Sequence, residues 1–169
     1  MGPDPRGLIT ACALALLAAP AASNAKTADE ARIRALEARF VAAFSAEDLD
    51  GIMNCYVPDE SLFVFDVIPP RQYVGAAAYR KDWEGFLKSF AGPVKVELTD
   101  LAVSTDGTIG YGHSAQHVQG KDAKGNPIEM VVRVSDVYRK IGGKWLIVQE
   151  HVSVPVDSET NKPDMMSKL

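Results

Sequence analysis

Apolar residues between positions 33 and 44 recur at steps of three and four, which is the spacing of one face of a helix. They are Ile33, Leu36, Phe40 and Phe44. Thr27 and Glu30 precede them in the T-x-x-E order of a capping box, in which the two side chains satisfy backbone donors at a helix start. We therefore expect a first helix from about Thr27 to Ser45, with most of the charged residues between its apolar positions facing water. These charged residues are Arg32, Arg34, Glu37 and Arg39.

Two further helices are indicated before the pattern changes. A short one begins at Asp48 and ends before Pro58, because proline cannot continue the hydrogen-bond ladder. A longer one spans about Ala76 to Phe90 and stops at Gly92–Pro93. Its apolar positions are Tyr79, Trp83, Phe86, Leu87 and Phe90.

Alternation with a period of two indicates strands elsewhere in the chain. Leu62–Val67 is expected to place Leu62, Val64 and Asp66 on one face, and Phe63 and Phe65 on the other. A short strand is expected at Gln72–Val74. Four longer strands are expected from Val94 onward, the last three at Thr108–Val118, Ile128–Lys140 and Lys144–Val154. Helices followed by an antiparallel meander predict an α+β domain with helices on one face of the sheet.

The last two strands form a hairpin that can pair in two registers. If Gly143 occupies a bulge position after the turn, Lys140 pairs with Lys144, and Arg133 lies opposite His151. In that register Asp136 lies opposite Val148, beside Glu150. If Gly142–Gly143 is a two-residue loop, Arg133 lies opposite Val152 and Asp136 opposite Gln149. The choice matters because a slip of one residue regroups the side chains that share a face.

Residues 1–25 resemble a secretory signal peptide and not a part of the fold. Arg6 is followed by the apolar run Leu8–Ala19 and by small residues up to Ala25. The run is shorter than the ~20 residues of a membrane span. We expect cleavage after Ala25, export to the periplasm or beyond the cell, and no membrane association afterwards. Residues 26–155 then form the domain, and residues 156–169 form a C-terminal tail.

Composition excludes several classes of function. The formal net charge is −4 with scattered charges, so the chain lacks the basic surface of a nucleic-acid-binding protein. Cys55 is the only cysteine left after cleavage, which excludes an internal disulfide, and a buried, inert thiol is its simplest interpretation. The chain has no His/Cys cluster, phosphate-binding loop or nucleophile elbow, and we expect neither a metal nor a cofactor.

The final hairpin, however, resembles a known family. Arg133–Lys140, Gly143–Val148 and His151–Ser153 are similar to the last hairpin of SnoaL-like proteins of the nuclear transport factor 2-like superfamily. The first two helices of this family are matched by Ala42–Phe44, Asp48–Ile52 and Tyr56, and its third by Gly75 at the start of a helix that bears a tryptophan.

The resemblance implies a cone-shaped, curved antiparallel sheet wrapped around three N-terminal helices, with a pocket at the open end. It also implies a homodimer and a small-molecule ligand, which we expect to be hydrophobic or to bear a carboxylate. Some members are cofactor-free cyclases, isomerases, dehydratases or epoxide hydrolases, whereas others only bind ligands or assemble. The fold therefore does not select a reaction.

Two residues are candidates for a catalytic base. Asp66 lies in an apolar strand, where burial raises the pKa of a carboxyl and suits it to abstracting a proton next to a carbonyl. His151 can transfer protons near neutral pH. Each also has an ordinary interpretation, Asp66 as a solvated strand end and His151 as a structural histidine.

The other candidates are residues expected to line the pocket or to bind a ligand. They are Tyr56, Tyr73, Trp83, His113, Arg133, Asp136, Tyr138 and Glu150. Tyr56 or Tyr138 could donate to a developing oxyanion, and Arg133 could bind a ligand carboxylate. The aromatic residues could equally be ordinary core, His113 could lie with His117 on a solvated sheet face, and Arg133 could pair with Asp136 or Glu150 at the rim.

Two functions from different classes follow. The first is a small-molecule pocket protein acting as a cofactor-free lyase or isomerase by acid–base proton transfer. The second is a non-catalytic ligand-binding or dimerisation module. Two titratable groups facing each other inside the cone favour the first, whereas a pocket filled by Trp83 and Phe86 favours the second.

Expression of the whole chain in a Gram-negative bacterium tests the predicted signal. We expect the intact mass of protein released from the periplasm to correspond to a chain beginning at Lys26. A protein that keeps residues 1–25 and stays in the cytoplasm would contradict the prediction.

Overall fold

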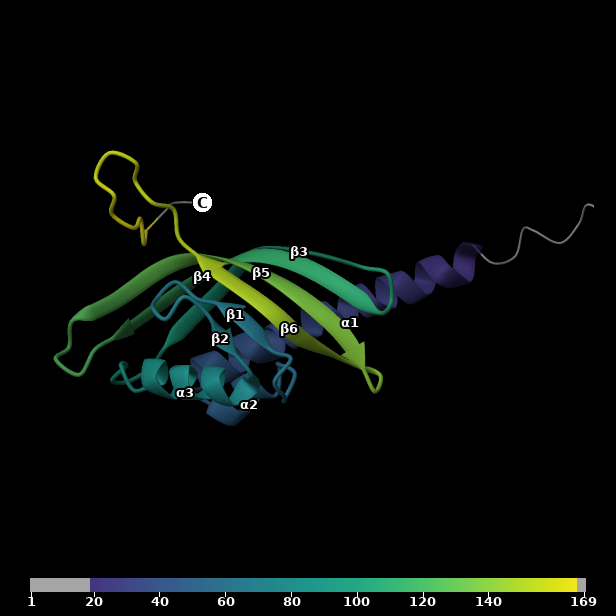
Figure 1. Ribbon diagram of the computed structural model, residues 1–169, viewed down its shortest axis with the longest axis horizontal. Helices are drawn as coiled ribbons and strands as arrows, with labels where there is room; N and C mark the ends of the chain where they lie inside the picture. Colours follow the sequence, from purple (N-terminus) through teal and green to yellow (C-terminus); the bar gives the residue numbers. More distant parts are fainter. Residues whose placement is uncertain (1–18, 167–169) are drawn as a thin grey trace, which may run out of the picture.

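The computed structural model describes residues 19–166, which form three helices and one six-stranded sheet (Figure 1). The helices are α1 (Ala19–Ser45), α2 (Leu49–Met53) and α3 (Ala76–Leu87). The strands are β1 (Phe63–Phe65), β2 (Tyr73–Val74), β3 (Lys95–Thr105), β4 (Ile109–Lys121), β5 (Pro127–Ile141) and β6 (Lys144–Ser153). They lie in the order β2-β1-β6-β5-β4-β3. The predicted α+β class is confirmed.

The long strands β3–β6 form an antiparallel meander that arches over the helices (Figure 1). Irregularities in pairing between Thr99 and Ala102, and between Val137 and Tyr138, interrupt the ladders, and such bulges bend a sheet. At one edge β1 runs parallel to β6 and antiparallel to β2. The result is a curved, unclosed sheet with helices on its concave side, as the predicted cone requires.

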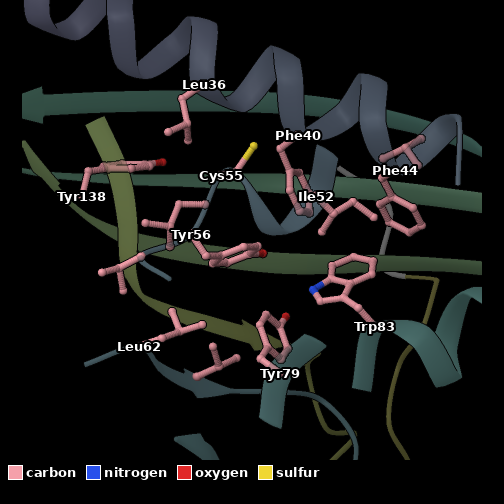
Figure 2. Close-up of a cluster of buried hydrophobic side chains, with 14 of the residues drawn as sticks. Leu36, Phe40, Phe44, Ile52, Cys55, Tyr56, Leu62, Tyr79, Trp83 and Tyr138 are labelled. Atoms are coloured by element: carbon pink, nitrogen blue, oxygen red, sulfur yellow. The ribbon is translucent and has the colours of Figure 1, made fainter. Parts of the chain in front are cut away.

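The apolar stripe of α1 is buried as predicted. Ile33, Leu36, Phe40 and Phe44 are at most 3% exposed and pack with residues of α2, α3 and the sheet (Figure 2). Cys55 lies in the same core as a free thiol, and its burial raises the pKa to about 11. The core therefore occupies the space between α1 and the concave face.

Helix α1 begins earlier than the capping box predicts. Its first residue is Ala19, so Thr27 lies inside the helix in the full-length chain. The alanine-rich residues 19–25 favour helix, and proline is tolerated in a first turn, which explains the extension past Pro20. Residues 1–18, which hold most of the predicted signal peptide, lie outside the described residues. Between residues 19 and 166, no helix is long and apolar enough to cross a membrane.

The final hairpin starts in the register of a two-residue loop. Ile141 faces Lys144 across the turn, and both residues of Gly142–Gly143 have positive φ angles, 56° and 80°. A two-residue turn of this kind needs positive φ at both central positions, which glycine adopts without strain. The bulge expected at Gly143 is therefore absent from the turn.

A bulge occurs farther along the hairpin instead. Val137 pairs with Gln149 but Tyr138 pairs with Ile147, so Val148 is the extra residue on β6. Beyond it the register is one that neither expectation contains, because Asp136 now faces Glu150 directly.

The bulge also changes which side of β6 faces inward. Before the bulge, Trp145 and Ile147 are the buried residues of β6. From the bulge onward, Val148 and Glu150 are buried. A regular strand would have placed Gln149 inward and Glu150 outward. The extra residue Val148 therefore turns the carboxyl of Glu150 toward the interior of the domain.

Trp145 connects the hairpin to α1. Its side chain is 4% exposed, and its Nε1 donates to Asp29 Oδ1 at 3.1 Å. Lys140 Nζ also lies 2.9 Å from Asp29 Oδ1. One helix carboxylate thus binds neighbouring side chains of β5 and β6.

The substitution Trp145→Ala should destabilise the domain by about 3–5 kcal/mol, the usual cost of deleting a buried tryptophan side chain. Chemical denaturation measures the change in the free energy of unfolding. Ile141→Ala is the control, because Ile141 is an apolar residue of the same hairpin that is 40% exposed. Equal effects of the two substitutions would show that Trp145 contributes nothing special.

Candidate functional site

A cavity of about 140 Å³ lies between α1, α3 and strands β4–β6. Apolar side chains make up most of its wall, among them Phe40, Phe44, Trp83, Phe86, Val132 and Val134. Four polar residues also line it: Asp66, Asp82, Gln116 and Glu150. The aromatic rings of α1 and α3 contact one another edge-on, as in Phe44–Trp83 with centroids 4.9 Å apart. Carboxyl groups in an apolar cavity are the feature that needs a chemical explanation.

Glu150 is held by two tyrosine hydroxyls. Tyr56 donates to its Oε2 at 2.9 Å, and Tyr79 donates to its Oε1 at 2.5 Å. All three residues are at most 3% exposed, and the two tyrosines lie side by side in the core (Figure 2). Both oxygens of this carboxyl are therefore fixed in position.

Asp66 approaches the same tyrosine from β1. Its Oδ2 lies 3.4 Å from the Tyr79 hydroxyl oxygen, and its Oδ1 accepts from the backbone N–H of Val67 at 2.6 Å. A hydroxyl has one proton, so while Tyr79 donates to Glu150 its oxygen can accept a hydrogen bond from the protonated form of Asp66. Asp66, Tyr79 and Glu150 can thus exchange protons along one line at the pocket wall.

A second pair of carboxyls lies behind this line. Asp136 faces Glu150 across the hairpin, and Tyr138 donates to Glu37 Oε1 at 2.9 Å. Tyr138 is also 3.5 Å from Asp136 Oδ2, whereas Asp136 Oδ1 has no hydrogen-bond partner among the described residues. Glu37 and Asp136 are both buried, so four carboxyls share one region of the interior.

Burial raises the pKa of each of these carboxyls. Desolvation is the largest cause in every case, and it brings the pKa of Glu37 and of Glu150 to about 7. The pKa of Asp136 is raised well above its ordinary value, because the charges of Glu150 and Glu37 add to desolvation. The pKa of Asp66 is raised as well, although the Val67 N–H opposes the shift.

No basic side chain offsets these shifts. Within residues 19–166, none of the four carboxyls forms an ion pair with lysine, arginine or histidine. An unpaired charge is costly in the interior, so burial shifts each of these groups toward its protonated form. In the same residues, no group of three His, Cys, Asp or Glu side chains is arranged to hold a metal ion.

Three of the predicted site residues lie away from the pocket. His151 follows Glu150 on β6 and so points to the opposite face, where its ring lies 5.5 Å from that of Phe65. Arg133 faces Ser153 on the same outer face, and His113 is exposed on β4. His151 does not approach the cavity, because the bulge at Val148 turns Glu150 inward instead. Arg133 points outward, because it alternates with the buried Val132 and Val134 on β5.

The remaining predicted residues fall into three groups. Asp66, Trp83 and Glu150 line the cavity. Tyr56, Asp136 and Tyr138 are buried behind its wall. Tyr73 is half-buried beside the cavity and donates to Asp82, a lining residue that the sequence did not single out.

Glu37 is the functional candidate that sequence reasoning missed. We assigned it to the wet face of the first helix, but its side chain is 2% exposed. Its spacing held the signal, since it lies four residues after Ile33 and three before Phe40 and therefore shares their stripe. An acidic residue on an apolar stripe can be buried when a hydrogen-bond donor lies within reach, as the Tyr138 hydroxyl does for Glu37.

Comparison with known proteins places the chain among proteins of related fold. Residues 33–157 match the model of the SnoaL-like domain. Among curated proteins, none matches the chain. One similar solved structure is a nuclear transport factor 2-like protein of unknown function from Pseudomonas putida KT2440. It is 32% identical, with a TM-score of 0.75 over 85% of this chain and 98% of that one.

Two other similar structures carry descriptions of an activity. One is a candidate scytalone dehydratase from Novosphingobium aromaticivorans DSM 12444, with 13% identity and a TM-score of 0.71 over 87% of this chain and 99% of that one. The other is a candidate dehydratase of the nuclear transport factor 2-like family from Streptomyces avermitilis. It has 14% identity and a TM-score of 0.66 over 76% of this chain and 97% of that one. At these identities the likeness is one of fold.

The buried carboxyls predict an unusual dependence of stability on pH. The pKa of Glu37 and of Glu150 is about 7 in the folded state, above the ordinary value of 4.5, so the folded chain binds more protons than the unfolded chain between these values. The stability that each group contributes is fully present below pH 4.5 and is lost as the pH rises through 7, by on the order of 3 kcal/mol for each group.

Urea denaturation between pH 5 and pH 8.5 measures this loss. Glu37→Gln and Glu150→Gln should each make the free energy of unfolding less dependent on pH, because each removes one titrating group. Glu159→Gln, at an exposed position of the C-terminal segment, should leave the dependence unchanged. A stability that is constant or rises over this range would exclude buried, proton-bearing carboxyls.

Proposed function

This chain belongs to the SnoaL-like domain family, and we propose that it binds a small molecule in its cavity and catalyses proton transfer as a cofactor-free lyase or isomerase. The observation that carries the proposal is the line of Asp66, Tyr79 and Glu150 at the wall of an apolar cavity. Two carboxyls that share a hydroxyl are the facing titratable groups that acid–base catalysis needs.

Asp66 is the better candidate for the base. Both Glu150 oxygens accept from tyrosine hydroxyls, whereas Asp66 Oδ2 has only the 3.4 Å contact with Tyr79. Asp66 also comes from β1 at the edge of the core and is half-buried, so it is closer to an entering ligand than Glu150 is. Its raised pKa makes the carboxylate a stronger base than a solvated one.

The reaction then needs only the residues of this chain. The Asp66 carboxylate takes a proton from the carbon next to a carbonyl, and the electron pair of the broken C–H bond moves toward the carbonyl oxygen. The protonated Asp66 returns this proton to a different carbon, which gives an isomer. Alternatively, a hydroxyl on the neighbouring carbon leaves as water after taking a proton, which gives an alkene. Tyr79 and a protonated Glu150 are acid groups that can supply a proton to the substrate, in place of the one that Asp66 has removed.

The comparisons support this class of reaction without identifying a substrate. Two similar structures are described as candidate dehydratases, and dehydration is the second outcome above. Because their likeness to this chain is one of fold, the proposal rests on Asp66, Tyr79 and Glu150.

One observation favours the second candidate, a non-catalytic ligand-binding protein. The Glu150 oxygens are both satisfied by Tyr56 and Tyr79, which is also how a structural buried carboxyl is stabilised. In that case the cavity binds a ligand through its apolar wall, and the acids only specify the packing of the hairpin. Measurement of activity separates the two candidates.

We also propose that the protein works outside the cytoplasm as a homodimer. The leader-like residues 1–25 support export. Ile109 and Tyr111, on the outer side of β4, are 50% and 62% exposed and support an interface on this face of the sheet.

Conversion of cyclohex-3-enone to its conjugated isomer tests the proposed chemistry, because the ring is small enough for the cavity and the reaction needs one proton removed and one returned. We expect turnover by the wild-type protein. Asp66→Asn should reduce kcat by 10²-fold or more, as loss of a general base does. Absorbance of the conjugated ketone measures the rate.

His151→Ala is the matched control for this experiment. His151 lies on the outer face, so its removal should leave kcat unchanged, and circular dichroism should confirm that both variants fold. Equal losses in the two variants, or no loss in Asp66→Asn, would exclude Asp66 as the base. Binding of the ketone without turnover by the wild-type protein would favour the non-catalytic candidate.

A further inference from the structure

One donor at the cavity has no partner. Trp83 lines the cavity and is 6% exposed, yet its Nε1 makes no hydrogen bond within the described residues. The other tryptophan differs, because Trp145 Nε1 donates to Asp29. Leaving a buried N–H unpaired is unfavourable, and such groups are uncommon in folded proteins. The unpaired donor of Trp83 therefore calls for a functional explanation.

The direction of this donor relates it to the acid groups. Figure 2 shows the indole nitrogen pointing toward the hydroxyl ends of Tyr56 and Tyr79. The rings of Tyr79 and Trp83 are 6.0 Å apart, and those of Tyr56 and Tyr79 are 5.4 Å apart. The N–H thus lies next to the two hydroxyls that bind Glu150. A ligand atom that reaches it would also lie near the proton-transfer groups.

The charge of the wall restricts the ligand. Three carboxyl groups line the cavity, those of Asp66, Asp82 and Glu150, and none of its lining residues is lysine, arginine or histidine. A ligand carboxylate would lose its hydration in this apolar cavity with no cation among the lining residues to compensate, which is unfavourable. This argues against the expectation of a carboxylate-bearing ligand, and the exposed position of Arg133 removes the residue that was to bind it.

The size of the cavity restricts the ligand further. Its volume of about 140 Å³ is close to that of an apolar cavity of ~150 Å³ that accepts benzene. Aromatic side chains such as Phe44, Trp83 and Phe86 line it and suit a flat ring. One six-membered ring with a small substituent is the size that fits.

We propose that the ligand is a small, uncharged ring compound with a carbonyl or similar acceptor, that Trp83 Nε1 donates to this acceptor, and that the apolar cavity, whose lining residues include no cation, rejects carboxylates. The inference rests on the proposed function in placing the ligand in the same cavity. Neighbouring rings cover the N–H, so the acceptor reaches it through a small rotation of Trp83 or Tyr79. The bond would then orient the acceptor next to Tyr79 and Glu150.

Benzamide and benzoate are the probes for this inference, because they have nearly the same shape and differ in charge. The chain has two tryptophans, so a ¹H–¹⁵N spectrum of the wild-type protein contains two indole resonances. At pH 7, we expect benzamide to move the Trp83 resonance in a saturable way and to leave the Trp145 resonance in place. Benzoate should bind at least tenfold more weakly.

Two variants test whether the N–H itself matters. Trp83→Phe keeps a ring but removes the donor, and it should weaken benzamide binding roughly tenfold, the effect of one lost hydrogen bond to a ligand. Trp145→Phe removes the other indole N–H and should leave the affinity unchanged. If either variant does not fold, the titration of the wild-type protein still decides the question.

Two results would overturn the inference. One is a Trp83 resonance that stays in place while benzamide shifts the methyl resonances of the cavity, and the other is binding of benzoate as tight as that of benzamide. These outcomes are independent of the proposed catalysis. A shift of the Trp83 resonance without turnover of cyclohex-3-enone would count against proton transfer and retain the inference. Turnover without the shift would support proton transfer and contradict the inference.

Discussion

Asp136 and Glu150 face each other inside the domain without a cation beside them, and much of the structure follows from how they are accommodated. Two ionised carboxyls in this position would repel each other and would each lose the solvation of water. Tyrosine hydroxyls reduce the cost by donating to Glu150 and Glu37, and burial keeps protons on the acids by raising the pKa. The interior therefore contains a cluster of buried acids and tyrosines beside a mostly apolar cavity.

This arrangement joins stability to chemistry. Buried groups with a raised pKa make the fold less stable as the pH rises, which is a cost that an ordinary apolar core would avoid. The same property keeps Glu150 ready to give or take a proton near neutral pH, at the wall of a cavity of ligand size. Strained or costly features of this kind concentrate at functional sites because function is the reason to retain them.

Adjacent residues of one strand lie on opposite faces of the sheet, one in the buried interior and the other at the outer surface. Glu150 is 3% exposed, whereas the adjacent His151 is exposed and contacts Phe65 at the outer surface. Asp66 enters the interior in the same way, because it alternates with Phe65 on β1. Inward residues can interact with a ligand in the cavity, and outward residues are available for contacts with another protein molecule.

Local spacing was enough to predict the order of helices and strands, the buried stripe of α1 and the shared face of Leu62, Val64 and Asp66, but not whether Asp66 is buried. It could not determine which residues of β6 face inward. The residues on either side of the extra residue Val148 pair with β5, and Val148 packs against the core, and both interactions arise only when distant segments meet. That single bulge placed Glu150 opposite Asp136 and left His151 outside. The tertiary structure alone therefore decided which acid faces the cavity, and it made Glu37 a member of the buried cluster through its hydrogen bond with Tyr138.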